Sequence, residues 1–500
     1  MSAVIGCDVG SQSLKGVLIG DDGTVLAEAS TPYDLSYPHP GWAEQDPNAW
    51  LEALATVVPQ ILERSGLDPG DVGTLGLASQ VDGVVAVDGR GEPLRPAIIW
   101  MDRRAEKQSA ALGRRMPQEG IFDLTGLNLD STHVAPKILW LRDEEPEVYR
   151  EATAFLLPGS YVVHRLTGEM VVDYSNASST MVYDVRNKDW SDEMLAVADL
   201  EPERLGRVAA ADEVAGTLTE AAARSLGLDT GTRVVVGCGD EHWACLGAGL
   251  VGPDLICDIT GTAEPVAAAA TEPVFDETGL VETHAHADSR LWLIENPGFV
   301  SGGSIRWYSD NVAHASYEEM TPEAEEIPPG SEGLVFLPCL SGAMTPTWNG
   351  NARGVFHGLS MKHGRGHMTR AVFEGCAYGF RDIVDRFEAM GIGGEEVRVV
   401  GGGARSPFWC QIKADVTGRT LRALKDPEAT ATGAAMLAGV AEGLFASLDE
   451  AAERLVEFGA TYEPGSGSRE AYDEAYGLYR TVYAALEPVF DREESAQDDG

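Results

Sequence analysis

The sequence lacks the features of membrane and secreted proteins. It contains no apolar run of about eighteen residues, the length that a membrane-spanning helix requires. The N-terminal residues MSAVIGCDVG have neither the basic region nor the apolar core of a secretory signal. The seven cysteines are scattered and form no CxxC pair, which argues against a zinc or disulfide framework. We therefore expect a cytoplasmic protein, with no membrane partner, whose cysteines are small buried thiols.

Basic residues are scarce. Lysine and arginine together number 37, against 79 aspartates and glutamates, so the formal net charge is −42 at pH 7. A nucleic-acid partner requires a basic surface, so this balance argues against one. A surface this acidic repels itself in dilute buffer, whereas at 1 M salt charges are screened beyond about 3 Å. The composition is typical of a salt-adapted cytoplasmic protein from a halophile. An acidic interaction protein, the alternative, fits poorly with so many predicted strands and glycines.

Two phosphate-binding motifs are also missing, the GxxxxGK[ST] of P-loop proteins and a GxGxxG after the first strand. Three glycines at 401–403 nevertheless separate a predicted strand over 397–400 from a predicted helix over 409–417. Such a loop lets a nucleotide approach the backbone and reach a helix N-terminus. A chain of 500 residues exceeds the size of one ordinary core, so we expect at least two domains.

Two similar hairpins begin the two halves of the chain. The predicted strand over 3–10 carries Asp8 and leads into a loop rich in glycine and hydroxyl groups. The predicted strand over 255–259 also carries an aspartate and leads into the Thr-Gly-Thr loop at 260–262. Backbone N–H and hydroxyl groups in such loops can bind phosphate oxygens, whereas a carboxylate such as Asp8 would bind Mg²⁺. The repetition predicts a duplicated domain with a cleft between the copies.

The segment over 233–249, RVVVGCGDEHWACLGAG, contains the main catalytic candidate. Its valines predict a short buried strand that ends at a glycine, directly before Asp240 and Glu241. A carboxylate at a strand end, beside glycines that let a ligand approach the backbone, is suited to act as a general base. The alternative interpretation is that Asp240 is only the N-cap of the following helix.

Polar residues recur where other predicted strands end. Gln80 and Asp82 follow one such strand, and Asp102 and Arg103 follow another. Ligands of α/β proteins bind at these ends, so together the four residues indicate a binding site. Each residue alone is more typical of a helix cap or a surface ion pair.

Five further segments carry expectations that the structure can test. We expect the Ser- and Asn-rich segment 171–183 either to line a pocket or to cross the surface. The H-x-H at 284–286 is interpreted as plain strand or loop rather than as a metal site. We predict a helix over 152–166, and a small-residue helix over 429–443 that packs close to the glycine loop. The acidic tail, 491–500, is expected to be disordered.

Five sequence segments, in this order, resemble the FGGY carbohydrate kinases of the actin/hexokinase/Hsp70 superfamily. The resemblance covers nearly the whole chain. It implies an α/β fold with two ribonuclease-H-like (actin-like ATPase) domains hinged over a cleft, at 1–250 and 251–490, followed by the acidic tail at 491–500. The five segments are GWAEQDP at 41–47, AIIWMDRR at 97–104, VVGCGDEHWACLGAG at 235–249, GVFHGLSMKHGRGHMTRAVFEG at 354–375 and VVGGGARSPFWCQIKADVTG at 399–418.

The resemblance also implies roles for individual residues. The enzyme would transfer a phosphoryl group from ATP to a sugar hydroxyl, with Mg²⁺ as cofactor. Asp240 matches the catalytic base, and Asp8 and Asp240 would face the Mg²⁺ ion. The residues that match the nucleotide and phosphate loops are Asp8, Gly10, Ser11 and Ser13 in the first hairpin, Thr260, Gly261 and Thr262 in the second, and Gly402, Gly403, Ala404 and Ser406 in the adenosine loop.

The loop after residue 79 indicates the sugar. Glycerol kinases of the family carry Arg-Glu there and xylulokinases carry Gln-Met-His-Gly, whereas this chain has Gln-Val-Asp-Gly. We predict conversion of D-xylulose to D-xylulose 5-phosphate, with a sugar alcohol such as xylitol or erythritol, or another ketose, as the alternative. A non-catalytic sugar or nucleotide sensor is the alternative of another class, and a homodimer stays open. The candidate sugar contacts are Lys15, Gln80, Val81, Asp82, Trp100, Asp102, Arg103 and Glu241.

Overall fold

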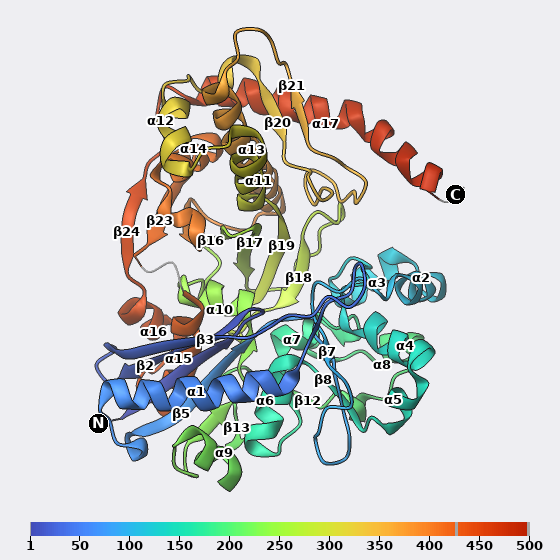
Figure 1. Ribbon diagram of the computed structural model, residues 1–500, viewed down its shortest axis with the longest axis vertical. Coiled ribbons are helices and arrows are strands. Elements are labelled where there is room, and N and C mark those ends of the chain that lie inside the picture. Colours follow the sequence, from blue (N-terminus) through green and yellow to red (C-terminus); the bar gives the residue numbers. More distant parts are fainter. Residues whose placement is uncertain (1, 426–428, 498–500) are drawn as a thin grey trace.

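Two sheets of seven strands each organise the part of the chain that the computed structural model describes, residues 2–425 and 429–497 (Figure 1). The first sheet has the strand order β13-β14-β5-β1-β2-β3, and β15 pairs with β5 beside this path. Its strands are β1 (Ala3–Val9), β2 (Ser13–Gly20), β3 (Val25–Pro32), β5 (Val72–Ser79), β13 (Val214–Thr217), β14 (Arg233–Val235) and β15 (Cys238–Gly239).

The second sheet repeats the pattern of the first. In the first sheet β1 pairs antiparallel with β2 and parallel with β5. In the second sheet β16 pairs antiparallel with β17 and parallel with β22. This repetition confirms the α/β fold class and the duplicated architecture. The strands of the second sheet, in spatial order, are β18 (Glu282–Ala285), β19 (Trp292–Val300), β17 (Ala263–Ala270), β16 (Leu255–Ile259), β22 (Glu396–Val400), β23 (Thr420–Leu424) and β24 (Phe458–Tyr462).

Helix α1 (Pro47–Ser65) covers one face of the first sheet and begins as its sequence predicts. The carboxylate of Asp46 caps it by accepting from the N–H of Asn48 at 2.9 Å, and Pro47 occupies the first helical position. Apolar side chains from Trp50 to Leu62 are buried against β2 and β3. Helices α6 (Pro158–Thr167) and α9 (Glu220–Leu226) pack beside α1.

An insertion of short elements extends the first half, at the lower right of Figure 1. It has its own apolar cluster, which includes Val134, Trp140 and Tyr183. Its helices are α2 (Glu106–Arg115), α3 (Gln118–Thr125), α4 (Val134–Glu144), α5 (Pro146–Glu151), α7 (Tyr174–Ser178) and α8 (Asp192–Ala198); the short strands of this half are β4 (Glu44–Gln45), β6 (Val85–Val87), β7 (Ala97–Ile98), β8 (Ala154–Leu156), β9 (Val171–Asp173), β10 (Tyr183–Asp184), β11 (Asp189–Trp190) and β12 (Arg207–Ala209).

The second sheet is covered by α13 (Arg365–Met390), whose predicted apolar stripe, including Phe373, Phe380 and Phe387, is buried. The other elements of this half are α11 (Gly302–Tyr308), α12 (Tyr317–Glu325), α14 (Pro407–Thr417), α17 (Arg469–Gln497), β20 (Val335–Leu337) and β21 (Val355–His357).

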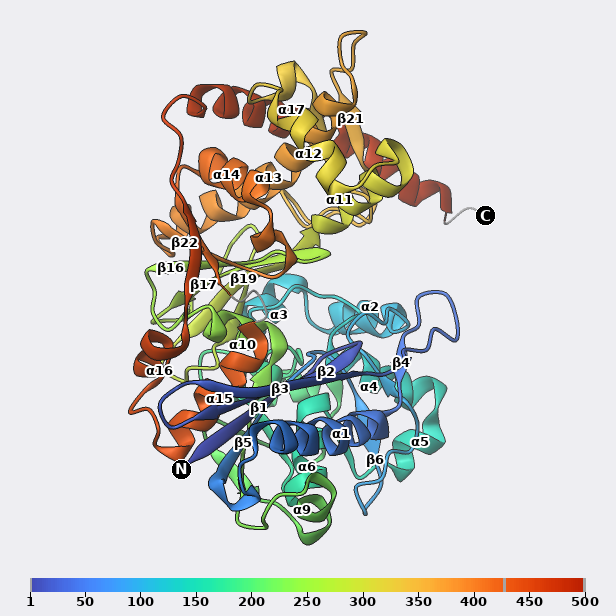
Figure 2. The same cartoon turned by 60° about the vertical axis from the view of Figure 1, so that its left-hand side comes forward.

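Helix α15 (Ala429–Glu442) departs from the expected position beside the glycine loop. It packs against β1 and β5 of the first sheet and against α10 (Asp240–Gly247). Figures 1 and 2 both show α15 and α10 beside the blue strands of the first sheet, and α16 (Leu448–Leu455) follows α15 there. Small side chains permit this approach, because a Cβ on Gly76 would lie 2.4 Å from the carbonyl oxygen of Ala434.

Two other expectations were wrong. The predicted helix over 152–166 is interrupted, since residues 154–156 form β8 and α6 starts only at Pro158, which has no N–H to donate within a helix. The tail, 491–500, was expected to be disordered, but α17 continues to Gln497; residues 498–500 lie outside the described residues. The tail segment DREESAQ, at 491–497, contains mostly residues with adequate helix propensity. The segment can therefore continue the helix that precedes it.

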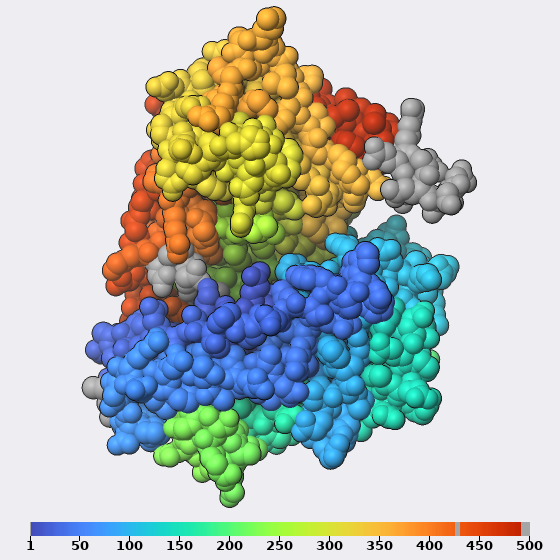
Figure 3. All heavy atoms as spheres, in the orientation of Figure 1, coloured from blue at the N-terminus to red at the C-terminus, as the bar shows by residue number. Residues whose placement is uncertain are grey.

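The seven cysteines are free buried thiols, as expected. Across the described ranges we find no helix whose length and apolar character would carry it through a bilayer. In the space-filling view the blue first half and the yellow-to-orange second half meet along a recessed band (Figure 3).

Candidate active site

Three parallel strand ends bring the first candidate residues together. The register places Asp8 of β1 beside Ala78 of β5, and Cys238 of β15 beside Ala78 from the other side. Gln80 and Asp240 directly follow β5 and β15. Asp8, Gln80 and Asp240, which are far apart in the sequence, therefore meet at one edge of the first sheet.

The first hairpin is held in shape by the residues around it. The N–H of Gly10 donates to the carbonyl oxygen of Ser13 at 3.2 Å, and the hydroxyl of Tyr33 donates to the carbonyl oxygen of Gly10. The indole N–H of Trp100 donates to Ser11 Oγ at 2.8 Å. Lys15 lies opposite Asp8 in the strand ladder. The loop is thus fixed while its residues Gly10, Ser11 and Ser13 keep part of their surface exposed.

Asp240 is the first residue of α10, and Gly239 occupies the N-cap position. The N-cap interpretation of Asp240 is therefore wrong, and its Oδ1 instead accepts from the N–H of Glu241 at 2.9 Å. Burial raises the pKa of Asp240 to about 6, and the charge of Glu295 acts in the same direction. Burial and then the charges of Asp8 and Asp240 raise the pKa of Tyr33, so this phenol lies near both carboxylates.

The segment 171–183 lies beneath Asp240 rather than crossing the surface. Ser175, in α7, accepts a hydrogen bond at 3.1 Å from the N–H of Gly239 and itself donates to the buried carboxylate of Asp173. The sequence showed only a run of hydroxyl and amide residues here and gave no sign of which one reaches the segment that carries Asp240. Position 239 leaves no room for a side chain, because Val81 lies 2.6 Å from where a Cβ would be.

Asp82 is held by two residues of the α4 region that the sequence did not indicate. Its backbone is in the left-handed region at φ 55°, and its carbonyl oxygen accepts from Lys137 Nζ at 2.6 Å. Its carboxylate Oδ1 lies 3.4 Å from Nδ1 of His133. Burial opposes protonation of His133, but the charge of Asp82 prevails and raises the pKa of the imidazole to about 9.

The structure gives Asp102 a different environment from the one expected of a sugar contact. Its side chain is fully buried, pairs with Arg104 at 2.7 Å, and accepts from the N–H of Ala43 at 2.6 Å. These bonds attach residue 102 to the segment before α1 and leave the carboxylate no route to a sugar. Trp100 and Arg103, by contrast, are exposed, and Arg103 lies 3.5 Å from Asp130.

Gln80 belongs to a buried amide network. Its side-chain N–H donates to Gln45 Oε1 at 2.9 Å, and Gln45 donates to the carbonyl oxygen of Ser11 at 2.9 Å. Gln80 Oε1 has no hydrogen-bond partner within the described structure. One side of this amide therefore fixes the first hairpin, while the other remains able to accept a hydrogen bond.

Glu241 faces acidic and imidazole groups of the second sheet. Burial above all raises the pKa of Glu241 and of Glu295, whose carboxyl groups contact each other. His284 Nε2 lies 3.2 Å from Glu295 and 3.6 Å from Glu282. No group of three or more histidine, cysteine or acidic side chains within the described ranges could hold a metal ion. His286 Nδ1 accepts from the backbone N–H of Asp288 at 2.9 Å.

In the second hairpin, the side chain of the first threonine points into the protein. Thr260 is buried, and its hydroxyl donates to Asp258 Oδ1 at 2.6 Å and accepts from Lys413 Nζ at 2.7 Å. The hydroxyl of Thr260 is therefore not available to a phosphate, which corrects the expected role of this side chain. Gly261 and Thr262 are exposed and remain the candidates.

The glycine loop lies against this hairpin. The N–H of Gly403 donates to the carbonyl oxygen of Thr260 at 3.0 Å, and a Cβ on Gly403 would lie 2.3 Å from Thr260. Gly402 has open space where its Cβ would be, and Ala404 is half-buried. Ser406 Oγ caps α14 by accepting from the N–H of Trp409 at 3.4 Å, so it fixes the helix start rather than facing outward.

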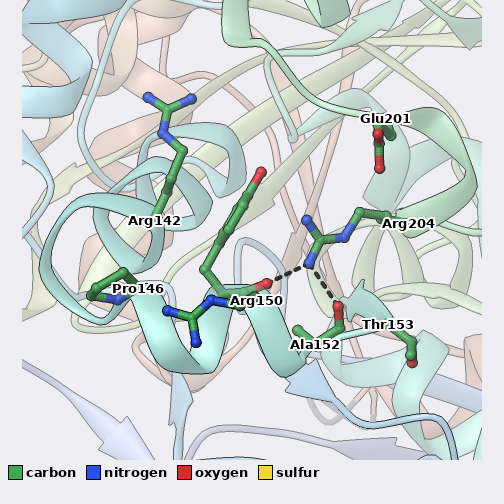
Figure 4. Close-up of a pocket in the computed structure, with 8 residues that line it drawn as sticks. Arg142, Pro146, Arg150, Ala152, Thr153, Glu201 and Arg204 are labelled. Atoms are coloured by element: carbon green, nitrogen blue, oxygen red, sulfur yellow. Dashed lines mark hydrogen bonds between the residues drawn. The ribbon is translucent and has the colours of Figure 1, made fainter.

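A separate pocket lies far from these strand ends, among α4, α5 and the segment around Arg204 (Figure 4). The guanidinium of Arg204 is occupied, because it donates to the carbonyl oxygens of Tyr149 and Ala152 at 2.7 Å each. Figure 4 shows Arg142 and Arg150 pointing in different directions, so these arginines do not converge on a common ligand.

The comparisons with known proteins agree with this arrangement. Residues 3–247 match the N-terminal domain, and residues 258–442 the C-terminal domain, of the FGGY family of carbohydrate kinases. A xylulose kinase of Escherichia coli is 32% identical over 97% of this chain and 99% of its own. The crystal structure of a xylulose kinase from Rhodospirillum rubrum superposes with a TM-score of 0.92, at 30% identity, over 98% of this chain and 100% of its own. A gluconate kinase from Lactobacillus acidophilus also has a TM-score of 0.92, at 25% identity, over 98% of this chain and 99% of its own.

The two domains with their matching strand hairpins, together with the match to both family domains, define an ATP-dependent kinase of small sugars. The chain belongs to the FGGY family of carbohydrate kinases, which confirms the resemblance seen in the sequence.

Proposed function

We propose that this kinase phosphorylates a pentulose, D-xylulose first, and that Asp240 is its general base. The observation that carries the proposal is the position of Asp240 at the meeting point of three strand ends, with a pKa raised by burial to about 6. A carboxyl group with this pKa is ionised at neutral pH and still basic enough to accept a proton. The similarity to xylulose kinases supports the choice of sugar.

In the proposed reaction, Asp240 accepts the proton of a sugar hydroxyl while that oxygen attacks the γ-phosphorus of ATP. The new P–O bond forms as the bond between the γ-phosphorus and the β–γ bridging oxygen breaks, and ADP leaves with that oxygen. We assign the phosphate contacts to Gly10, Ser11 and Ser13 of the first hairpin, and to Gly261 and Thr262 of the second. The hydroxyl groups of Ser11, Ser13 and Thr262 would stabilise the charge on the transferring group, while the N–H groups of Gly10 and Gly261 close their own hairpins.

The residues at the first strand edge fit a Mg²⁺ site. Mg²⁺ usually binds one or two protein carboxylates and completes its shell with phosphate oxygens and water. Asp8 and Asp240, which both act on the pKa of Tyr33, supply such a pair. We propose that they hold Mg²⁺, which would neutralise phosphate charge when bound. The backbone of Gly402, Gly403 and Ala404 would receive the adenosine.

The charges around Asp82 favour a neutral sugar over a sugar acid. The carboxylates of Asp82 and Asp240 can accept hydrogen bonds from hydroxyl groups. The carboxylate of gluconate would instead be repelled by both, and the two cations beside Asp82 are already engaged by it, His133 by the carboxylate and Lys137 by the carbonyl oxygen. The same reasoning admits an alditol, because a sugar alcohol offers hydroxyl groups without a charge, and this remains the second candidate. We therefore assign Gln80, Val81, Asp82, Trp100, Arg103, Glu241 and Lys15 to the sugar side.

The test is ATP consumption by the purified full-length chain with Mg²⁺ in concentrated KCl. D-xylulose, L-xylulose, D- and L-ribulose, xylitol, erythritol, glycerol and D-gluconate would be compared. We expect the highest kcat/KM on D-xylulose, and a loss of about 10²–10⁴-fold in Asp240→Asn. Preference for an alditol would contradict the pentulose assignment but would leave the assignment of Asp240 as general base intact. ATP binding without turnover on any of these compounds would support a sensor instead.

The compartment and assembly are part of the proposal. Seven free buried thiols are the expected state in a reducing cytoplasm, which we propose as the location. We also propose a salt-rich cell interior, because of the net charge of −42. A homodimer is the assembly to compare with a monomer by light scattering.

A further inference from the structure

Lys413 is a buried lysine in the second half that faces two carboxylates and a hydroxyl group. It lies in α14, is 1% exposed, and contacts Asp258 at 2.6 Å, Glu264 at 2.9 Å and Thr260 Oγ1 at 2.7 Å. The ammonium group donates hydrogen bonds to Asp258 and Thr260, and the carboxylate of Glu264 faces it as an ion-pair partner. Burial opposes its charge, but the carboxylates of Asp258 and then Glu264 prevail and raise the pKa of Lys413.

The three partners of Lys413 all belong to the second hairpin. Asp258 lies in β16, Thr260 follows that strand, and Glu264 lies in β17. Thr260 also donates from its hydroxyl to Asp258 Oδ1 at 2.6 Å, so the lysine closes a ring of hydrogen bonds at the base of the loop. Glu264 in turn accepts from the hydroxyl of Ser301.

The exposed part of the hairpin is held by the far side of the same network. The backbone N–H of Ser301 donates to the carbonyl oxygen of Thr262 at 3.2 Å, and that of Gly303 does so at 3.0 Å. Glu264 therefore connects Lys413, through Ser301, to the loop residue that faces outward. The hydroxyl of Thr260, which could have bound a ligand, is used to anchor the loop instead. We therefore expect the conformation of residues 260–262 to depend on this connection.

The glycine loop at 401–403 lies just before helix α14. Ser406 caps the helix directly after that loop, and Lys413 lies two turns further along. The N–H of Gly403 donates to the carbonyl oxygen of Thr260 at 3.0 Å, and the N–H of Thr260 donates to the carbonyl oxygen of Val400 at 3.0 Å. The proposed adenosine loop and the proposed phosphate hairpin are therefore both attached to Thr260, which Lys413 of α14 holds in place.

We propose that Lys413 is a positioning residue that sets the affinity for ATP by holding the phosphate hairpin in register with the adenosine loop. It does not touch the nucleotide. The inference rests on the proposed assignment of both loops to ATP. It predicts that removal of the ammonium group weakens nucleotide binding and leaves sugar binding unchanged, since the contacts of Lys413 lie wholly within the second half of the molecule.

The experiment compares Lys413→Met with Lys137→Met in the full-length chain. Lys137 is the matched control, because it too is fully buried but binds the carbonyl oxygens of Asp82 and Ile99 on the sugar side. Affinity for Mg·ATP would be measured by calorimetry, and KM for each substrate by steady-state kinetics. We expect Lys413→Met to raise the ATP Kd at least about tenfold, the value of one lost charge-assisted hydrogen bond, with the sugar KM within about twofold. Lys137→Met should instead raise the sugar KM and leave the ATP Kd nearly unchanged.

Equal changes in both KM values, or an unchanged ATP Kd in folded Lys413→Met, would overturn the proposal. If the single variant does not fold, because two carboxylates are left buried without a cation, Lys413→Met/Asp258→Asn/Glu264→Gln removes the charges together. Wild-type ATP affinity in that folded triple variant would equally overturn it, and rescue of affinity by Lys413→Arg would support it. The calorimetry needs no turnover, so an incorrect sugar assignment leaves this test intact, whereas a wild-type chain that does not bind ATP would defeat the proposed function itself.

Discussion

Asp240 and Asp102 are both aspartates at strand ends, but their surroundings give them different roles. Asp102 is neutralised by Arg104 at 2.7 Å and is fully buried. Asp240 has no cation among the groups that shift its pKa, and burial together with Glu295 makes it a stronger base than an ordinary aspartate. The residue type at a strand end therefore does not decide between chemistry and structure; the neighbouring charges do.

This difference predicts the pH dependence of the reaction. A general base works only when ionised, so kcat/KM for the sugar should fall as the pH drops below about 6, the pKa to which burial raises Asp240. Removing the charge of Glu295 in Glu295→Gln should lower that pKa and move the acid limb to lower pH. The measurement is kcat/KM at saturating ATP from about pH 5 to about pH 9. An acid limb near the ordinary aspartate value of about 4 in the wild type would contradict the assignment.

At the scale of elements, α15 connects parts of the chain that the sequence separates. The helix follows the second-half strand β23 but packs on β1, β5 and α10, the helix that begins with Asp240. A Cβ on Gly433 of α15 would lie 2.4 Å from the carbonyl oxygen of Trp243. We therefore expect a shift of α15 to move α10 and Asp240 with it, because the two helices are closely packed.

The close approach of α15 predicts a stability effect. Gly76→Ala would place a Cβ 2.4 Å from the carbonyl oxygen of Ala434, so either the strand or the helix must move. We expect a loss of about 1–3 kcal/mol, the usual cost of overpacking, seen as a lower urea midpoint of tryptophan fluorescence. Gly252→Ala is the matched control, since its Cβ would have no neighbour within 4 Å. Equal midpoints for the two variants would show that the interface is looser than described.

At the scale of the whole molecule, the dominant feature is charge. A net charge of −42 is spread along the chain and must be accommodated on a surface with only 37 basic residues. Self-repulsion of this kind destabilises the compact state, and it is screened within about 10 Å at 0.1 M salt but within about 3 Å at 1 M.

We therefore predict that the thermal midpoint rises by several degrees or more between about 0.1 M and about 2 M KCl, because stronger screening lowers the repulsion in the folded state. Circular dichroism during heating measures it. An uncharged osmolyte such as sucrose at the same concentration is the control, since it acts by exclusion from the surface and not by screening. A midpoint that is insensitive to KCl, or equally raised by sucrose, would contradict the salt-adaptation proposal.

The sequence by itself determined the elements that depend on local pattern. Alternating and apolar runs marked β1, β2, β5 and β16, and an aspartate followed by proline marked the start of α1, because caps and periodicity act within a few residues. The repeated strand–acid–hydroxyl hairpins were sufficient to predict a duplicated α/β fold. Asp240 was identified as the candidate base in the same way, since its glycines and its strand lie next to it in the chain.

Only the tertiary structure decided what depends on contacts between distant segments. It placed α15 on the first sheet, bonded the carboxylate of Asp102 to the N–H of Ala43, turned the hydroxyl of Thr260 toward Lys413, and set His133 against Asp82. Lys413 and Thr260 are 153 positions apart in the sequence. A side chain's partners across such separations follow from strand register and helix packing, which no local pattern encodes, and those partners decide whether a polar residue binds a substrate or holds the fold together.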